Sequence, residues 1–177
     1  MLRPRQHQQV VIDWVGAKQA KLDMAFSVHV PDSATGTGAG RDDIWLSKKL
    51  SRYFAGLDER ALRRTSQTKI ERLVVLHHSP DVGWHAHFQM ATPMHMSQLE
   101  LLRLAAKLWK RALGPHYNCK VKRRLFWGQP VVGAHLPYML DHLSINTIDW
   151  ENTHFTSSIG QDQTIALSCG APALEIA

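Results

Sequence analysis

Apolar and polar residues alternate in short stretches of the chain. Within residues 26–30 the apolar side chains are separated by Ser27 and His29, and residues 84–90 show the same alternation. Residues 73–76 are continuously apolar and run into His77 and His78. Because side chains alternate across a strand, these patterns predict three strands. The Ser-Pro-Asp-Val-Gly segment between the last two predicts a hairpin turn.

Two other segments carry apolar residues every three or four positions. In the first, which begins with two acidic residues, these are Leu46, Leu50, Phe54 and Leu57. In the second they are Leu99, Leu102, Ala106, Trp109 and Leu113. Ser97 and Glu100 form a capping-box pattern before the second segment, and a glycine-proline pair follows it. The spacing predicts two amphipathic helices.

The remaining segments complete the predicted domain. A fourth strand is expected within residues 117–126, and a last helix is expected from about Pro137. Residues 1–22 are interpreted as an N-terminal appendage and residues 156–177 as a flexible C-terminal tail, which leaves residues 23–155 as one domain. The order of elements predicts an α+β fold, with an antiparallel sheet of about four to five strands and helices packed on one face.

Composition and charge restrict the classes of function. With 177 residues, of which 44% are hydrophobic, the chain can bury one core. No apolar stretch has the length of a membrane span, no apolar segment follows the basic N-terminus, and two cysteines make no disulfide framework. These features predict a cytoplasmic protein without a membrane partner. The glycines of residues 32–41 lack phosphate-loop spacing, so no nucleotide cofactor is expected. A formal charge of +6 favours a polyanionic partner.

The His85-Ala86-His87 segment is the strongest chemical signal in the sequence. Residues i and i+2 of a strand share a face, with Cα atoms about 7 Å apart. Two neutral imidazoles on one face are a suitable pair of ligands for a divalent metal ion. The other interpretation is two half-exposed histidines on a polar sheet face without a metal.

Further residues can complete such a site. His77 or His78 lies on the neighbouring strand of the predicted hairpin and offers a third ligand, and His29 lies on the polar side of the first strand. Tyr138 and Asp141 are one turn apart on the last predicted helix. A tyrosine beside a metal ion is a plausible nucleophile toward a phosphate.

A run of cations without an acid extends from residue 103 to residue 124, with aromatic residues interleaved. Charge runs are usually solvated faces, but cations with aromatic residues are also how single-stranded nucleic acid is bound. The candidate nucleic-acid-binding residues are Lys107, Lys110, Arg111, Lys120, Lys122 and Arg124.

These motifs resemble those of the HUH endonucleases, the rolling-circle replication initiators and relaxase-like proteins of plasmids and phages. In that family, a first strand motif precedes a histidine–hydrophobic–histidine strand and a later helix with Tyr-x-x-Lys. Residues 26–30, 84–88 and 138–141 stand at these three places. The sequence DWENTH at residues 149–154 is similar to a segment of small Rep-like proteins of proteobacteria, and the likeness covers roughly residues 24–155.

The resemblance implies a Rep-like sandwich related to the ferredoxin fold. It also implies metal-dependent nicking and joining of single-stranded DNA or an origin hairpin, as in rolling-circle replication initiation. His85, His87 and His77 would hold Mg²⁺ or Mn²⁺, and Tyr138 would form a 5′-phosphotyrosine link, with Asp141 as the second catalytic residue.

Two departures from the family pattern leave alternatives open. The usual lysine after the tyrosine is Asp141, which could contact Tyr138 or the metal, or could mark a protein that no longer cuts DNA. Many relatives have Glu where His77 stands, and a third imidazole favours Mn²⁺, Co²⁺, Ni²⁺ or Zn²⁺ over Mg²⁺. The alternatives are a non-catalytic DNA-binding relative, for origin binding or regulation, and a small protein that binds metal through histidines.

Overall fold

The structure is a computed structural model, and it describes seven stretches of the chain. These are residues 22–30, 43–62, 69–79, 83–114, 125–131, 148–156 and 162–164. They form β1 (Met24–His29), α2 (Asp43–Ala61), β2 (Arg72–Ser79), β3 (Gly83–Met90), α3 (Gln98–Leu113), β4 (Phe126–Pro130), β5 (Ile148–Thr156) and β6 (Asp162–Thr164). Neither helix in these stretches has the length and apolar character needed to cross a membrane.

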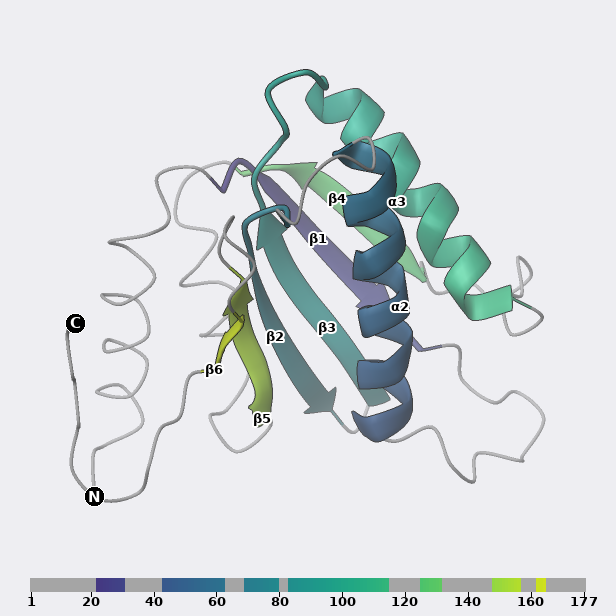
Figure 1. Cartoon of the computed structure of the whole chain (residues 1–177). Coiled ribbons are helices and arrows are strands. Elements are labelled where there is room, and N and C mark those ends of the chain that lie inside the picture. The colour runs from purple at the N-terminus through teal and green to yellow at the C-terminus, as the bar shows by residue number, and fades with distance from the viewer. Residues whose placement is uncertain are drawn as a thin grey trace, which may run out of the picture.

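The strands form one sheet in the order β4-β1-β3-β2-β5-β6, and each neighbouring pair is antiparallel. Helices α2 and α3 lie side by side over one face of this sheet (Figure 1). The predicted α+β fold is therefore confirmed, with six strands in the described sheet instead of about four to five. The predicted hairpin is the β2–β3 pair, in which Ser79 pairs with Gly83.

The hydrophobic core lies between the two helices and one face of the sheet. Phe26 of β1 pairs with Phe88 of β3, and the two rings stack with centroids 5.1 Å apart. From α2, the ring of Phe54 meets Phe88 edge-on at 5.2 Å. From α3, the fully buried Trp109 donates a hydrogen bond from Nε1 to the carbonyl of Leu125, which precedes β4. The alternation that predicted β1 and β3 thus selects the side chains of this core.

Helix α3 begins as its sequence indicates but buries a different set of residues. The Glu100 amide donates to Ser97 Oγ at 3.2 Å, and the Ser97 amide donates to Glu100 Oε2 at 2.8 Å, so the predicted capping box is present. The expected apolar stripe is partly wrong, because Leu99 is 52% exposed. The buried residues of α3 are Leu101, Ala105, Leu108, Trp109 and Leu113.

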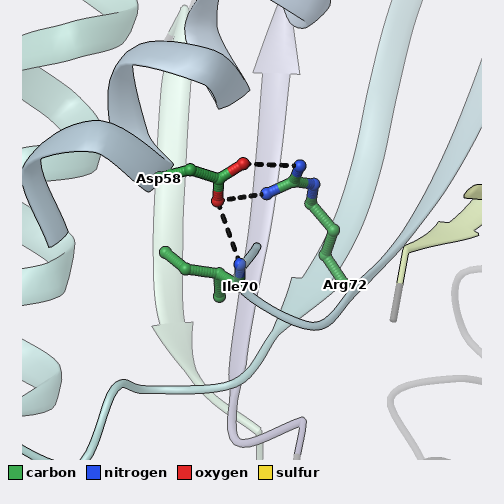
Figure 2. Close-up of polar contacts among 3 residues, drawn as sticks. All are labelled: Asp58, Ile70 and Arg72. Atoms are coloured by element: carbon green, nitrogen blue, oxygen red, sulfur yellow. Dashed lines mark hydrogen bonds and ion pairs between the residues drawn. The ribbon is translucent and has the colours of Figure 1, made fainter. Parts of the chain in front are cut away.

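A buried ion pair connects the C-terminal half of α2 to the start of β2 (Figure 2). Asp58 accepts hydrogen bonds from Nη1 and Nη2 of Arg72, at 2.7 and 2.9 Å, and from the amide of Ile70 at 3.0 Å. The Arg72 guanidinium also lies 4.4 Å from the centre of the Phe54 ring. Three contacts thus satisfy one carboxylate and fix the helix to the sheet.

The C-terminal part of the sheet differs from the sequence-based expectation. The fourth strand begins at Phe126, the last residue of the segment in which it was expected. The DWENTH segment belongs to β5, where no strand was predicted, and β6 lies inside the expected tail, which corrects the interpretation of residues 156–177 as wholly loose. The helix expected from about Pro137 and the N-terminal appendage fall outside the described residues.

Candidate functional site

Three histidines form a row across the centre of the sheet. His85 of β3 pairs with His29 of β1 on one side and with His77 of β2 on the other. Residues directly opposite in an antiparallel sheet project from the same face. The backbone register alone therefore places these three imidazoles side by side.

His87 adds a fourth ring on the same face, two residues along β3. Its ring centroid lies 5.1 Å from that of His85 and 5.2 Å from that of His77, and both contacts are edge-on. The His77 and His85 rings stack at 5.5 Å. The three histidines expected to bind a metal are thus in mutual contact.

His29 extends the cluster at the other side of His85. The two rings are nearly parallel, with an interplanar angle of 8° and centroids 5.3 Å apart. His29 Nε2 also shares a hydrogen bond of 3.1 Å with Ser27 Oγ. The sequence placed His29 on the polar side of its strand, but the pairing register that brings it against His85 was not apparent from the sequence.

His78 is excluded as the third ligand, because it occupies the opposite face. It pairs with Trp84, whose ring lies 5.0 Å away and packs partly against the hydrophobic core. The sequence left His77 and His78 as alternatives for this role, and the register selects His77.

The hydrogen bonding of His85 fixes its tautomer. Nδ1 lies 2.9 Å from the Gly83 carbonyl oxygen, which can only accept, so Nδ1 carries the proton. The Nε2 lone pair then remains available to a ligand. A backbone carbonyl that holds the second nitrogen of an imidazole is the common arrangement of metal-binding histidines.

Electrostatics keep His85 neutral. Burial is the main cause that lowers its pKa below the ordinary histidine value, the hydrogen bond to Gly83 opposes the shift, and the electrostatic interaction with His78 adds to it. A neutral imidazole is the form that binds a metal ion. The environment therefore maintains His85 in a ligand form at neutral pH.

The histidine face is buried, although α2 and α3 lie on the other face of the sheet. His77 and His85 are 0% and 4% exposed, and Ser27 and Gln89 on the same face are also buried. His87 is partly buried. The hydrophobic core cluster contains none of the four histidines. Ala25, Leu73 and Val75 lie on the same face and are 0% exposed, so the histidines belong to a buried layer of mixed apolar and polar side chains.

The spacing of the rings suits metal binding, but their orientation does not yet do so. With Zn–N distances of about 2.0–2.1 Å, two imidazoles on one ion have ring centres about 5 Å apart, which is close to the spacing seen. However, the described part of the chain contains no group of three or more His, Cys, Asp or Glu side chains already arranged around a single point. Stacked rings would have to rotate before their nitrogen atoms could converge on an ion.

The other candidate residues are not brought to this face. Lys107, Lys110 and Arg111 are exposed on α3, in the layer on the opposite side of the sheet. Tyr138, Asp141, Lys120, Lys122 and Arg124 lie outside the described residues. The described site therefore consists of the histidines, and the basic residues of α3 form a separate surface.

Comparison with protein-family models finds no match, and comparison with curated proteins finds none either. The likeness to HUH endonucleases therefore depends on the motifs of the sequence alone.

Proposed function

We propose that this protein is a metal-dependent DNA nicking and joining domain of the HUH type, which acts in rolling-circle replication of a plasmid or phage. The observation that carries the proposal is the contact among His77, His85 and His87 on one sheet face. The sequence motif predicts that these rings share a face, and the register provides that arrangement.

The three histidines would hold the divalent ion. His85 supports this role best, because its Nδ1 proton is directed at Gly83 and its Nε2 is left for a ligand. His29, stacked on His85, keeps that ring in place and borders the site. When bound, the ion neutralises charge on a phosphate and makes the phosphorus more susceptible to attack.

Tyr138 is the proposed nucleophile. Its phenolic oxygen would form a bond to phosphorus while the bond to the 3′ oxygen breaks, which leaves a 5′-phosphotyrosine and a free 3′-hydroxyl. The reverse attack by a 3′-hydroxyl would rejoin the strand. Asp141, one turn further along the predicted helix, would orient the tyrosine or the ion.

A non-catalytic DNA-binding protein is the second candidate. Asp141 replaces the lysine of the family pattern, and the described cations of α3 lie on the opposite side of the sheet from the histidines. Both features suit a protein that binds DNA without cutting it.

Incubation of the full chain with labelled single-stranded oligonucleotides and Mn²⁺ distinguishes the candidates. The nicking enzyme yields a covalent protein–DNA adduct that does not form when a chelator is present from the start, in Tyr138→Phe or in His85→Ala, but still forms in His78→Ala. DNA binding without an adduct in Mn²⁺, Mg²⁺, Co²⁺ and Zn²⁺ would favour the second candidate. Metal-induced stabilisation without DNA binding would indicate a histidine metal-binding protein.

A further inference from the structure

The outer surface of the helical layer is rich in cations. In α3, Arg103, Lys107 and Arg111 recur every four residues, so they follow one another along one exposed face over about 12 Å. In α2, Lys48 and Arg52 are likewise four residues apart and exposed. Two stripes of positive charge therefore lie on two helices that pack side by side (Figure 1).

The two stripes adjoin along the contact between the helices. Lys49 Nζ donates a hydrogen bond of 2.9 Å to the Ala112 carbonyl, and a side chain at Gly56 would touch Leu108, so these residues mark the facing sides. Arg52 is three residues after Lys49, so it lies beside the facing side of α2, and it is exposed to solvent. Arg111 has the same relation to Ala112 on α3. The helical geometry thus places Arg52 and Arg111 on the solvent side of the contact between the helices, one on each helix.

The acidic residues of these helices offset only part of this charge, and one of them, Glu100, interacts electrostatically with Arg103. Asp58 is bonded to Arg72 in the buried ion pair, and Glu100 is bonded to Ser97 in the capping box at the far end of α3. Glu59 lies in the C-terminal part of α2, beyond the lysine and arginine stripe. The surface around Arg52 and Arg111 therefore keeps an excess of positive charge.

The aromatic residues of this layer favour a double-stranded partner. Proteins that hold single strands stack bases on exposed aromatic rings. Here Tyr53, Phe54 and Trp109 are buried in the core, and the half-buried Trp45 has Lys49 over its ring at 5.1 Å. The described residues of the two helices thus offer cations but no exposed aromatic rings. Such a surface suits duplex DNA, because its bases are already stacked on one another. Duplex DNA also carries a phosphate charge about every 1.7 Å of its axis.

We propose that the helical layer binds duplex DNA through its phosphates, at a surface formed by Lys48, Arg52, Arg103, Lys107 and Arg111. This surface lies on the opposite side of the sheet from the histidines. It would hold double-stranded DNA without regard to sequence, on the side of the sheet away from the buried histidines. The proposal does not depend on whether the chain cuts DNA.

The test measures binding of a short blunt-ended duplex to the full chain by fluorescence anisotropy over a range of salt concentrations. The triple variant Arg52→Gln, Lys107→Gln, Arg111→Gln should bind at least tenfold more weakly at low salt. Its slope of log K against log salt should be shallower by about 2 to 3, because each phosphate contact contributes about 0.9. The matched control, Arg60→Gln, removes an exposed cation near the end of α2 and should change affinity less than twofold.

Three results would overturn the proposal: no duplex binding by the unmodified chain, an unchanged salt slope in the triple variant, or an equal loss of single-strand and duplex binding. Loss of binding to phosphatidylserine vesicles without loss of duplex binding would also overturn it, in favour of a membrane surface. Unchanged circular dichroism shows that the triple variant folds. Failure of the nicking proposal is detected separately, as absence of the covalent adduct from the unmodified chain, and it leaves the duplex-binding result unaffected.

Discussion

The two faces of the sheet are built from the same strands but serve different purposes. On the helical face, Phe26 and Phe88 stack in the core and form the support for α2 and α3. On the other face, the alternate positions of the same two strands include His29, His85 and His87. The helical face carries the aromatic core, whereas the other face combines buried apolar residues with the histidine cluster. Alternation along a strand therefore lets single adjacent substitutions separate stability from function.

Phe88 and His87 give the strongest contrast between the faces. Phe88→Ala removes a fully buried ring and should lower the free energy of unfolding by about 3–5 kcal/mol. His87→Ala removes a partly buried ring and should lower it by about 1 kcal/mol. Urea denaturation followed by circular dichroism measures both. Equal losses would show that the histidine face is as important to folding as the core.

The ion pair of Asp58 and Arg72 tests how firmly the helical face is fixed. Asp58→Ala leaves a guanidinium buried without its carboxylate, because the Arg72 side chain is 5% exposed, and should cost about 3 kcal/mol. The double variant Asp58→Ala, Arg72→Met removes both charges and should recover part of this loss. Thermal denaturation of the three proteins gives the comparison, and a double variant less stable than Asp58→Ala would contradict it.

Two glycines, one on β4 and one on α2, test how tightly the helical layer packs at two different places. A Cβ at Gly128 would lie 2.6 Å from Phe26 Cδ1 and 2.7 Å from Leu102 Cδ1, so Gly128→Ala should destabilise the protein by about 1–3 kcal/mol. At Gly56 the nearest atom would be Leu108 Cδ2 at 4.0 Å, and Gly56→Ala in the middle of α2 should stabilise by about 0.5–1 kcal/mol. Differential scanning calorimetry measures both melting temperatures. Melting temperatures that change in the same direction in the two variants would contradict this prediction.

The pH dependence of the free energy of unfolding reports on His85, and it is the smallest of the expected effects. Because burial lowers the pKa of His85 in the folded chain, the unfolded chain binds more protons as the pH falls through the ordinary histidine range. The contribution of His85 is therefore present above a pH of about 6.5 and is lost below it. Urea midpoints should fall less with acidification in His85→Ala than in the unmodified chain. An identical pH profile for both proteins would show that His85 is not held neutral.

Much of the fold follows from periodicity in the sequence. Strict alternation predicts β1 and β3, and the four-residue spacing from Leu46 predicts α2. The observed elements match these predictions because each of these segments has a single apolar face, and that face is the one that is buried. In α3, leucines occur on more than one side of the helix, so the spacing alone did not show that Leu99 would be exposed while Leu101 and Leu108 would be buried.

The elements that sequence reasoning missed depend on pairing between distant strands. The segment of β5 is rich in Asp, Glu and Asn, which have low strand propensity, yet it pairs with β2 across a register shift between Val74 and Leu76. The position of His29 against His85 likewise depends on the β1–β3 register. No local pattern contains this information. The predicted hairpin turn placed His77 and His78 beside the strand of His85 but did not select between them.

Titration of Mn²⁺ and Zn²⁺ into the full chain by isothermal calorimetry is the most direct test of the histidine face. The account predicts a single ion bound per chain, with binding lost in His85→Ala and weakened in His77→Ala and His87→Ala. His78→Ala, which alters the other face, should bind as the unmodified chain does. Absence of binding by either ion, or binding that His85→Ala leaves unchanged, would contradict the account.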